Sequence, residues 1–281
     1  MSEFQNTIDL LGDDVVLLSL IDRSIESYDD DTLESVGIGA FSECLELTSV
    51  NLSYVTEIKQ LTFKNCAKLT GVNMPLATTI GQQAFNKCVS LESIDLPSVT
   101  TIDYSVFDGC IALTSINVPL LTEVKGSAFS SCRSLKSINL PFITKIDGST
   151  FNTCSSLVSV NVPSITTIGS SAFSNCSALT SIYIPLVTKI DSNAFNGCSG
   201  LKSIDLPSVT TIDYSAFSYC RSLQTVRLPA TPPTLKNTNA FSNILTTCVF
   251  YIPTGSLAAY QAATNWSSLT STYTFTEEDR E

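Results

Sequence analysis

Hydrophobic residues return to the same places in the chain every 22 residues. Phenylalanine occupies nine such positions, from Phe41 to Phe217, and a cysteine follows each one three residues later. A leucine comes three residues after the cysteine, then Val or Ile, a second aliphatic residue and, in eight of the nine copies, a proline. The unit reads A-F-x-x-C-x-x-L-x-x-I-x-L-P-x-V-T-x-I. Nine copies without a slip in register indicate a repeat architecture.

One 22-residue unit cannot bury its own apolar side chains, whereas stacked units can. The end of the segment L-x-x-I-x-L alternates with period two, which predicts a short strand whose aliphatic residues point inward. The spacing of three residues in A-F-x-x-C-x-x-L predicts a helical turn on the opposite side. We therefore predict an α/β solenoid. It would be a right-handed superhelix with short parallel strands on its concave face, capped at both ends.

The repeat divides the chain into three predicted parts. Residues 1–31 form an acidic N-terminal cap with an apolar cluster at residues 8–21, and residues 32–230 hold the nine repeats. Residues 231–281 form a C-terminal cap, because the register breaks there and Ile244 stands where a cysteine is expected. Within this cap Ser256 can begin a helix that runs to about Trp266. Residues 269–275 then alternate like a final strand, before a flexible acidic end.

The repeat resembles a known family. The string Cys198-x-x-Leu201-x-x-Ile204-x-Leu206-Pro207, preceded by Ala194-Phe195, is similar to the BspA-like branch of leucine-rich repeat proteins. The resemblance covers residues 32–230 and extends weakly to the end of the chain. It implies a leucine-rich repeat superhelix with no shared catalytic residues. Members are mostly bacterial or protist surface proteins that attach to host or matrix proteins, and similar repeats occur in proteins encoded by bacteriophages.

Charge changes the picture only at the ends of the chain. The net charge is −11, of which residues 1–34 carry −9 and residues 277–281 carry −3, so the body is nearly neutral at +1. Such a body has no basic stripe for phosphates, and we expect no nucleic-acid partner. No apolar run approaches the roughly 18 residues needed to cross a bilayer, so we expect no membrane insertion. No secretion signal is visible.

Cysteine and histidine usage argues against catalysis. Nine of the ten cysteines occupy one repeat position, and there is no C-x-x-C motif and no histidine. Side chains stacked in parallel do not converge for a disulfide, so we predict buried, reduced thiols that fill space in the core. Without imidazole, most nucleophile–base pairs and zinc enzymes are excluded. Four aspartates recur at one turn position and are interpreted as turn residues rather than an acid pair: Asp103, Asp147, Asp191 and Asp213. We expect no enzyme, no metal and no cofactor.

The outward strand positions carry the candidate binding residues. One row is almost entirely serine and the next is mostly asparagine. Tyr183, Asp205 and Arg227 depart from the asparagine row on three successive repeats, and we predict that they contact a ligand. Aromatic residues at other exposed-looking positions are interpreted as surface aromatics packed on their neighbours: Tyr104, Phe142 and Tyr214. A threonine in eight of the nine repeats, from Thr56 to Thr210, is expected to bond the backbone of neighbouring coils.

These observations favour a non-catalytic binding or adhesion module at the cell surface or secreted. Its partner would be a host or matrix protein or a surface glycan, bound by the concave face or by an edge. The alternative is a structural protein of a phage virion, in the tail or at the host contact. The lack of a visible secretion signal and a capping segment that starts at Met1 favour that alternative. A glycosidase that uses the turn aspartates is the least favoured hypothesis. No ligand identity or oligomeric state is predicted.

Overall fold

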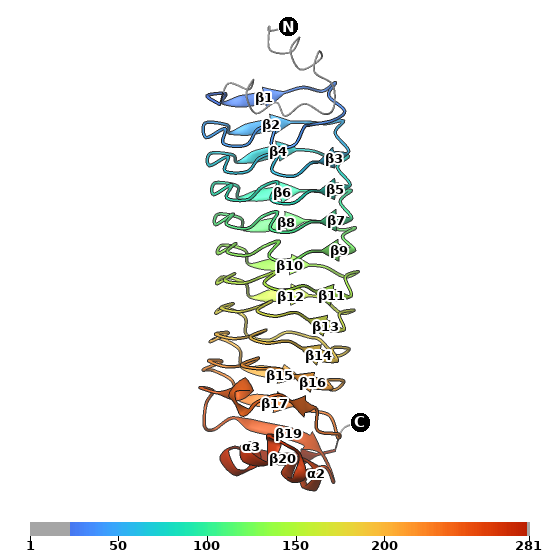
Figure 1. The fold of residues 1–281 in the computed structure, drawn as a ribbon, viewed down its shortest axis with the longest axis vertical. Helices are drawn as coiled ribbons and strands as arrows, with labels where there is room; N and C mark the ends of the chain where they lie inside the picture. Colours follow the sequence, from blue (N-terminus) through green and yellow to red (C-terminus); the bar gives the residue numbers. More distant parts are fainter. Residues whose placement is uncertain (1–22, 280–281) are drawn as a thin grey trace. The chain divides into compact units, whose positions relative to one another are not determined.

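The structure is a computed structural model that describes residues 23–279. The chain falls into two compact units, residues 1–135 and residues 136–281. The apolar cluster at residues 8–21, and with it most of the predicted N-terminal cap, lies outside the described residues. Each unit is a parallel β-solenoid built from 22-residue turns (Figure 1).

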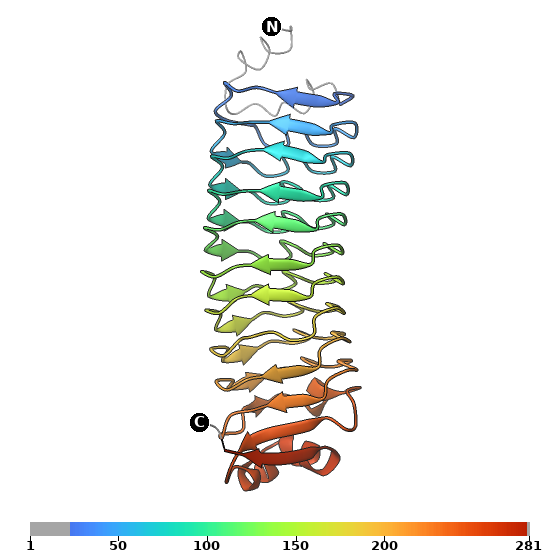
Figure 2. The ribbon, with the colours of Figure 1, turned by 180° about the vertical axis from the view of Figure 1, so that it is seen from behind.

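The first unit has two columns of parallel strands. The first column holds three-residue strands in two sheets: β1 (Ser27–Asp29), β2 (Ser49–Asn51) and β4 (Gly71–Asn73), then β6 (Ser93–Asp95) and β8 (Ser115–Asn117). The second column holds two-residue strands in one sheet: β3 (Glu57–Ile58), β5 (Thr79–Ile80), β7 (Thr101–Ile102) and β9 (Glu123–Val124). Paired residues are one repeat apart, as in Ser49 with Gly71. Figure 2 shows both columns from the opposite side.

The second unit repeats this arrangement and ends in helices. Its first column holds β10 (Ser137–Asn139), β12 (Ser159–Asn161), β15 (Ser203–Asp205), β17 (Thr225–Arg227), β19 (Val249–Pro253) and β20 (Thr274–Glu278). Its second column is one five-stranded sheet of β11 (Lys145–Ile146), β13 (Thr167–Ile168), β14 (Lys189–Ile190), β16 (Thr211–Ile212) and β18 (Thr234–Leu235). The helical segments are η2 (Thr238–Phe241), α2 (Leu257–Ala262) and α3 (Trp266–Thr272).

Columns of identical side chains form the core of each unit. In the first unit the rings from Phe41 to Phe129 stack with centroids 5.1–5.5 Å apart. Those from Phe151 to Phe241 in the second unit do so at 5.2–5.3 Å. The cysteines line a neighbouring column and donate hydrogen bonds as well as filling space. The Cys66 thiol, for example, donates to the carbonyl oxygen of Phe41 at 3.0 Å. Periodicity thus predicts correctly which side chains are buried.

The segment A-F-x-x-C-x-x-L differs from its prediction. It forms a run of tight turns instead of a helical turn, with hydrogen bonds such as Cys66 N–H to the Phe63 carbonyl oxygen at 3.1 Å. The residue before each cysteine from Cys44 to Cys220 has a positive φ, as Asn65 does at 59°. A left-handed residue cannot continue a right-handed helix. Consecutive tight turns place apolar residues at the same three-residue spacing as a helix. The apolar pattern alone therefore did not distinguish a run of turns from a helical turn.

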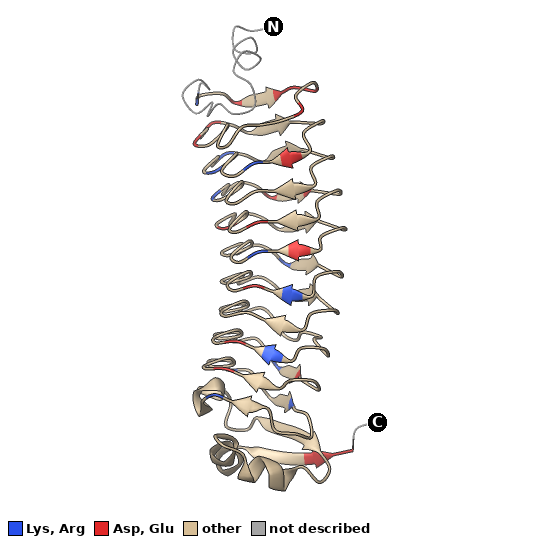
Figure 3. Cartoon of the chain, turned by 45° about the vertical axis from the view of Figure 1, so that its right-hand side comes forward, with Lys and Arg blue, Asp and Glu red and all other residues tan. Residues whose placement is uncertain are grey.

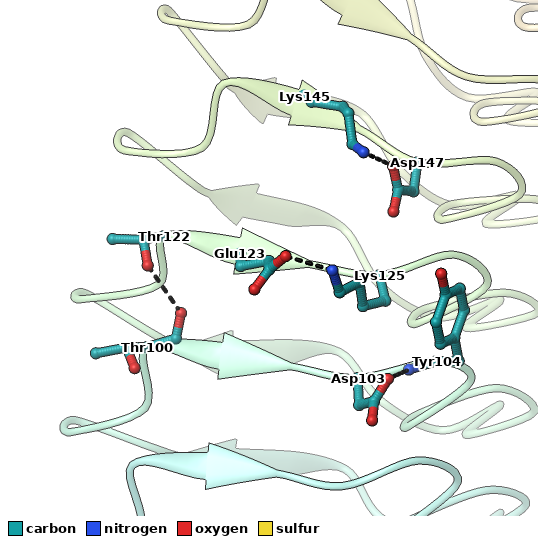
Figure 4. A network of polar contacts seen from close by, with 8 residues as sticks. All are labelled: Thr100, Asp103, Tyr104, Thr122, Glu123, Lys125, Lys145 and Asp147. Atoms are coloured by element: carbon teal, nitrogen blue, oxygen red, sulfur yellow. Dashed lines mark hydrogen bonds and ion pairs between the residues drawn. The ribbon is translucent and has the colours of Figure 1, made fainter.

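The threonine ladder is confirmed. In the first unit the Thr122 hydroxyl donates to the carbonyl oxygen of Thr100 at 3.2 Å (Figure 4), and the same bond joins Thr78 to Thr56. In the second unit Thr188 and Thr210 donate one turn back in the same way. Each hydroxyl therefore holds its turn to the preceding one.

The C-terminal segment differs in its boundaries from the expected single helix. Helix α2 ends at Ala262, and Asn265, with φ of 65°, separates it from α3. The indole of Trp266 donates to the carbonyl oxygen of Pro233 at 2.7 Å and is fully buried. Glu277 and Glu278 belong to β20, so the acidic end begins later than predicted. Capping by this segment and the right-handed sense of the superhelix stay predictions.

Two glycines provide a matched test of the turn geometry. Gly109 has φ of 78°, and a Cβ there would meet the Lys87 side chain at 3.2 Å. A Cβ at Gly71 would meet nothing within 4 Å. We expect Gly109→Ala to lower the free energy of unfolding by about 1 kcal/mol, because alanine is strained at positive φ. Gly71→Ala should leave it unchanged or raise it slightly. Urea unfolding followed by circular dichroism measures both, and equal effects would contradict the left-handed turn.

Candidate binding surface

The outward residues of the three-residue strands form a polar surface in each unit, called here the strand face. Along each strand the first and third residues point outward and the second points inward. In β6, for example, Ser93 and Asp95 are exposed while Ile94 is 5% exposed. The surface therefore consists of a serine row and an asparagine row. The second column carries more charge, because Glu57, Glu123, Lys145 and Lys189 begin β3, β9, β11 and β14, and Figure 3 shows red and blue strands among tan ones.

Side-chain hydrogen bonds hold the asparagine row in place. In the first unit the Asn51 amide donates to the Asp29 carboxylate at 2.7 Å, and Asn73 donates to Asn51 at 2.7 Å. In the second unit Asn161 donates to Asn139 at 2.6 Å. Side chains that are already ordered lose less conformational entropy when a partner binds. The strand face is thus a preorganised surface of hydrogen-bonding groups.

Tyr183 interrupts this surface. Its side chain is 74% exposed, the largest value among the exposed large hydrophobic residues of the described chain. The residues around it, 181–184, carry the sequence pattern of a strand but form none, so β12 and β15 belong to separate sheets. Tyr183 also stands where an asparagine would continue the hydrogen-bonded asparagine row. The structure therefore presents an aromatic ring beside polar rows.

Asp205 and Arg227 lie on the two turns that follow Tyr183. They are register partners on the paired strands β15 and β17, so the structure brings these two together. Asp205 is exposed. The Arg227 Nε lies 3.1 Å from a carboxylate oxygen of Glu278, and the guanidinium lies 4.9 Å from the ring centroid of Tyr251. Arg227 is thus held within the protein. That the three residues contact a ligand stays a prediction.

The recurring aspartates make local contacts at their turns. Asp103 accepts a hydrogen bond from the Tyr104 backbone N–H at 2.7 Å (Figure 4), and Asp213 accepts one from Tyr214 at the same distance. Asp147 and Asp191 form ion pairs with Lys145 and Lys189, two residues before each of them. These contacts support their interpretation as turn residues.

The aromatic residues interpreted from the sequence as surface aromatics do lie at the surface. Tyr104 and Tyr214 are each 50% exposed, and Phe142 is 56% exposed. Phe142 belongs to a row of exposed residues directly after the repeat's proline position, together with Leu76, Leu120 and Leu186. None of these residues lies on the strand face.

Sequence reasoning missed a hollow of about 450 Å³ over β1, β2 and β4. It coincides with Gly71, which stands in the serine row and leaves open space above its Cα. The signal was present in the sequence as the one glycine of that row. Whether this glycine leaves a hollow depends on the residues around it, and only the structure shows those.

The thiols are buried. None of the ten cysteines, all of which lie within residues 23–279, forms a disulfide. Desolvation by burial raises the pKa of Cys176, Cys220 and Cys248 to about 12 in each case. No group of three or more potential metal ligands occurs in the part of the chain that the structure describes. Within residues 23–279 no helix is both long enough and apolar enough to span a membrane.

The stacked parallel turns define the chain as a leucine-rich repeat solenoid. A sequence profile of the BspA type leucine rich repeat region, in six copies, matches residues 24–135, 78–202 and 122–248. The chain belongs to this family. No curated protein sequence matches it.

Several solved structures are similar. A leucine-rich repeat protein of T. pallidum is 29% identical, with a TM-score of 0.51, over 55% of this chain and 78% of that one. A leucine-rich repeat protein of Bacteroides ovatus is 22% identical, with a TM-score of 0.44, over 92% of this chain and 85% of that one. A leucine rich cell surface protein of Faecalibacterium prausnitzii is 23% identical, with a TM-score of 0.42, over 85% and 90%. The last two are similar in fold alone.

Burial predicts that the thiols are unreactive in the folded protein. We expect no reaction of the native protein with Ellman's reagent at pH 8, because the reagent needs an accessible thiolate. In guanidinium chloride all ten cysteines should react. Absorbance of the released thiolate measures both states. Rapid reaction of several thiols in the native protein would contradict the buried column.

The same pKa shifts predict alkaline destabilisation. The folded pKa of the buried thiols lies above the usual value of 9.0, so the unfolded chain releases its protons first as pH rises. The stability these groups contribute is present below pH 9 and is lost between pH 9 and about 12. Urea midpoints should fall over this range, and more gently in a Cys176→Ala variant, which has one such thiol fewer. Identical slopes in the two proteins would contradict the assignment.

Proposed function

We propose that this chain is a non-catalytic binding module that recognises an extracellular protein or glycan through its strand face. The observation that supports this most directly is Tyr183, the most exposed large hydrophobic side chain described, on a surface that is otherwise polar. Tyrosine is enriched among the residues that dominate binding energy, because it combines a large apolar ring with a hydroxyl group. A conspicuous exposed ring on a stable scaffold favours a contact with a partner.

The neighbours of Tyr183 fit that role. The preceding turn presents Asn161, whose amide is held by Asn139, and the following turn presents the exposed carboxylate of Asp205. A partner could stack on the ring and form hydrogen bonds with groups on both sides of it. Arg227 is engaged by Glu278 and lies near the ring of Tyr251, so it is less available to a partner. Tyr183 and Asp205 are therefore the principal proposed contacts.

The proposal places the protein at a cell surface or in the secreted fraction, as the BspA-type repeat suggests. An oxidising compartment normally favours disulfides over free thiols. The burial of all ten cysteines protects them from oxidants in solution, so their reduced state is compatible with export. The virion alternative would present the same strand face to a host, and the binding proposal holds for either location.

A binding array tests the proposal directly. Wild-type protein would be applied to immobilised extracellular matrix proteins and to a glycan array, beside Tyr183→Ala. We expect at least one partner whose binding falls about tenfold or more in the variant, since hot-spot truncation commonly costs 2 kcal/mol or more. The dissociation constant for that partner would then be measured by surface plasmon resonance.

Tyr214→Ala is the matched control. Tyr214 is also an exposed tyrosine of the second unit, but it lies on a turn after β16 and away from the strand face. It should bind like the wild type, and thermal unfolding should be the same for both variants. A partner bound equally well by wild type and Tyr183→Ala would remove Tyr183 from the site, and binding to no partner at all would remove the proposed function.

A further inference from the structure

The hollow over β1, β2 and β4 combines open space with polar groups from three consecutive turns. Its volume of about 450 Å³ lies in the range of small-ligand sites. Its polar rim consists of the outward residues Ser27, Asp29, Ser49, Asn51 and Asn73, with Gly71 between them. Tyr28, Val50 and Val72 also line it, but they are the middle residues of the three strands, whose side chains point inward.

Gly71 contributes to this open space because it has no side chain. Apart from the repeat that contains Gly71, all of the first eight repeats carry serine at this position of the serine row. A Cβ added to Gly71 would meet no atom within 4 Å, and the residue does not have a positive φ. Backbone geometry therefore does not require glycine here. The missing side chain leaves room for a ligand atom between Ser49 and the following turn.

The rim retains hydrogen-bonding capacity after its internal bonds are made. Asn73 donates to Asn51, and Asn51 donates to one carboxylate oxygen of Asp29. That leaves the second oxygen of Asp29 and the amide oxygen of Asn73 as acceptors, and one N–H of Asn51 as a donor. The hydroxyls of Ser27 and Ser49 are exposed and have no partner within residues 23–279. The rim thus offers both donors and acceptors to a ligand.

The local charge restricts the chemical classes of ligand that the hollow could bind. Glu26, Asp29 and Asp31 are exposed on and beside β1, and Arg23 is the one base among residues 23–34. This negative potential opposes anionic ligands such as sialylated or sulfated sugars. A purely cationic ligand would satisfy Asp29 but would leave the Asn51 N–H without an acceptor. A hydroxyl group both donates and accepts, so a polyhydroxylated neutral ligand matches the whole rim.

We propose that this hollow binds a neutral sugar residue of a glycan. The Asp29 carboxylate would accept hydrogen bonds from sugar hydroxyls, and the Asn51 amide and the two serines would complete the contacts. The open space at Gly71 would receive one face of the sugar ring. The inference rests on the proposed binding function and assigns the glycan class to a second position on the strand face, in the first unit.

Calorimetric titration with defined neutral sugars tests the site. The probes would be lactose, maltotriose, cellotriose and mannotriose, with 3′-sialyllactose and an oligolysine peptide as charged comparisons. Gly71→Leu fills the hollow, and Asp29→Asn removes the charged acceptor with little change of shape. We expect a neutral probe to bind wild type and to bind each variant about tenfold or more weakly, because hydrogen bonds to charged groups are the strong ones. Sialyllactose should bind more weakly than lactose.

Ser115→Leu is the matched control, because Ser115 occupies the same row on β8 of the same unit and does not line the hollow. It should bind the neutral probe like wild type, and thermal unfolding should show that every variant is folded. Equal binding by wild type and Gly71→Leu, no neutral sugar binding, or a preference for oligolysine that Asp29→Asn abolishes would each overturn the inference. The same panel and the protein array, run on Tyr183→Ala, separate the two proposals. Partner binding that depends on Tyr183 alone leaves the proposed function standing without this site.

Discussion

The in-register stacking of 22-residue turns is the constraint on which the other features of each unit depend. A single turn cannot enclose its own Phe and Cys side chains, and its main-chain groups bond to the turns on either side. Phe63 N–H, for example, donates to the Ala84 carbonyl oxygen at 2.7 Å, and Thr78 N–H donates to that of Thr56 at 2.8 Å. Stability therefore arises between turns. Each inward residue must match its equivalents one repeat earlier and later.

This constraint explains why so much of the fold was predictable from the sequence. A side chain that must match its neighbours recurs at a fixed interval, so the Phe, Cys and aliphatic columns could be predicted from the sequence alone. The threonine ladder could be predicted for the same reason. The conformation between Phe and Cys was not, because left-handed residues there include Asn65, Lys87 and Ser131 as well as glycine. Lysine and serine do not indicate a positive φ, and the apolar spacing fits a helix equally well.

Features that involve a single repeat were harder to predict. The exposure of Tyr183 followed from its outward position, but the loss of the strand around it did not. The pairing of Arg227 with Glu278 joins residues 51 positions apart, across the break in register, and no periodic pattern indicates it. The hollow at Gly71 depends on the absence of a side chain. Periodicity describes what the repeats share, whereas the proposed recognition depends on positions where one repeat differs from the others.

The division between inward and outward positions has a consequence for how such a protein can change its partner. Outward side chains such as Ser93 and Asn117 contribute to hydrogen bonding at the surface but not to the enclosed core. Substitutions there cost little stability, since surface changes away from special contacts are usually small in effect. Gly71 subtracts a side chain from its row and Tyr183 adds a large one, and neither alters the apolar columns. Binding specificity can therefore vary from repeat to repeat while the solenoid itself is preserved.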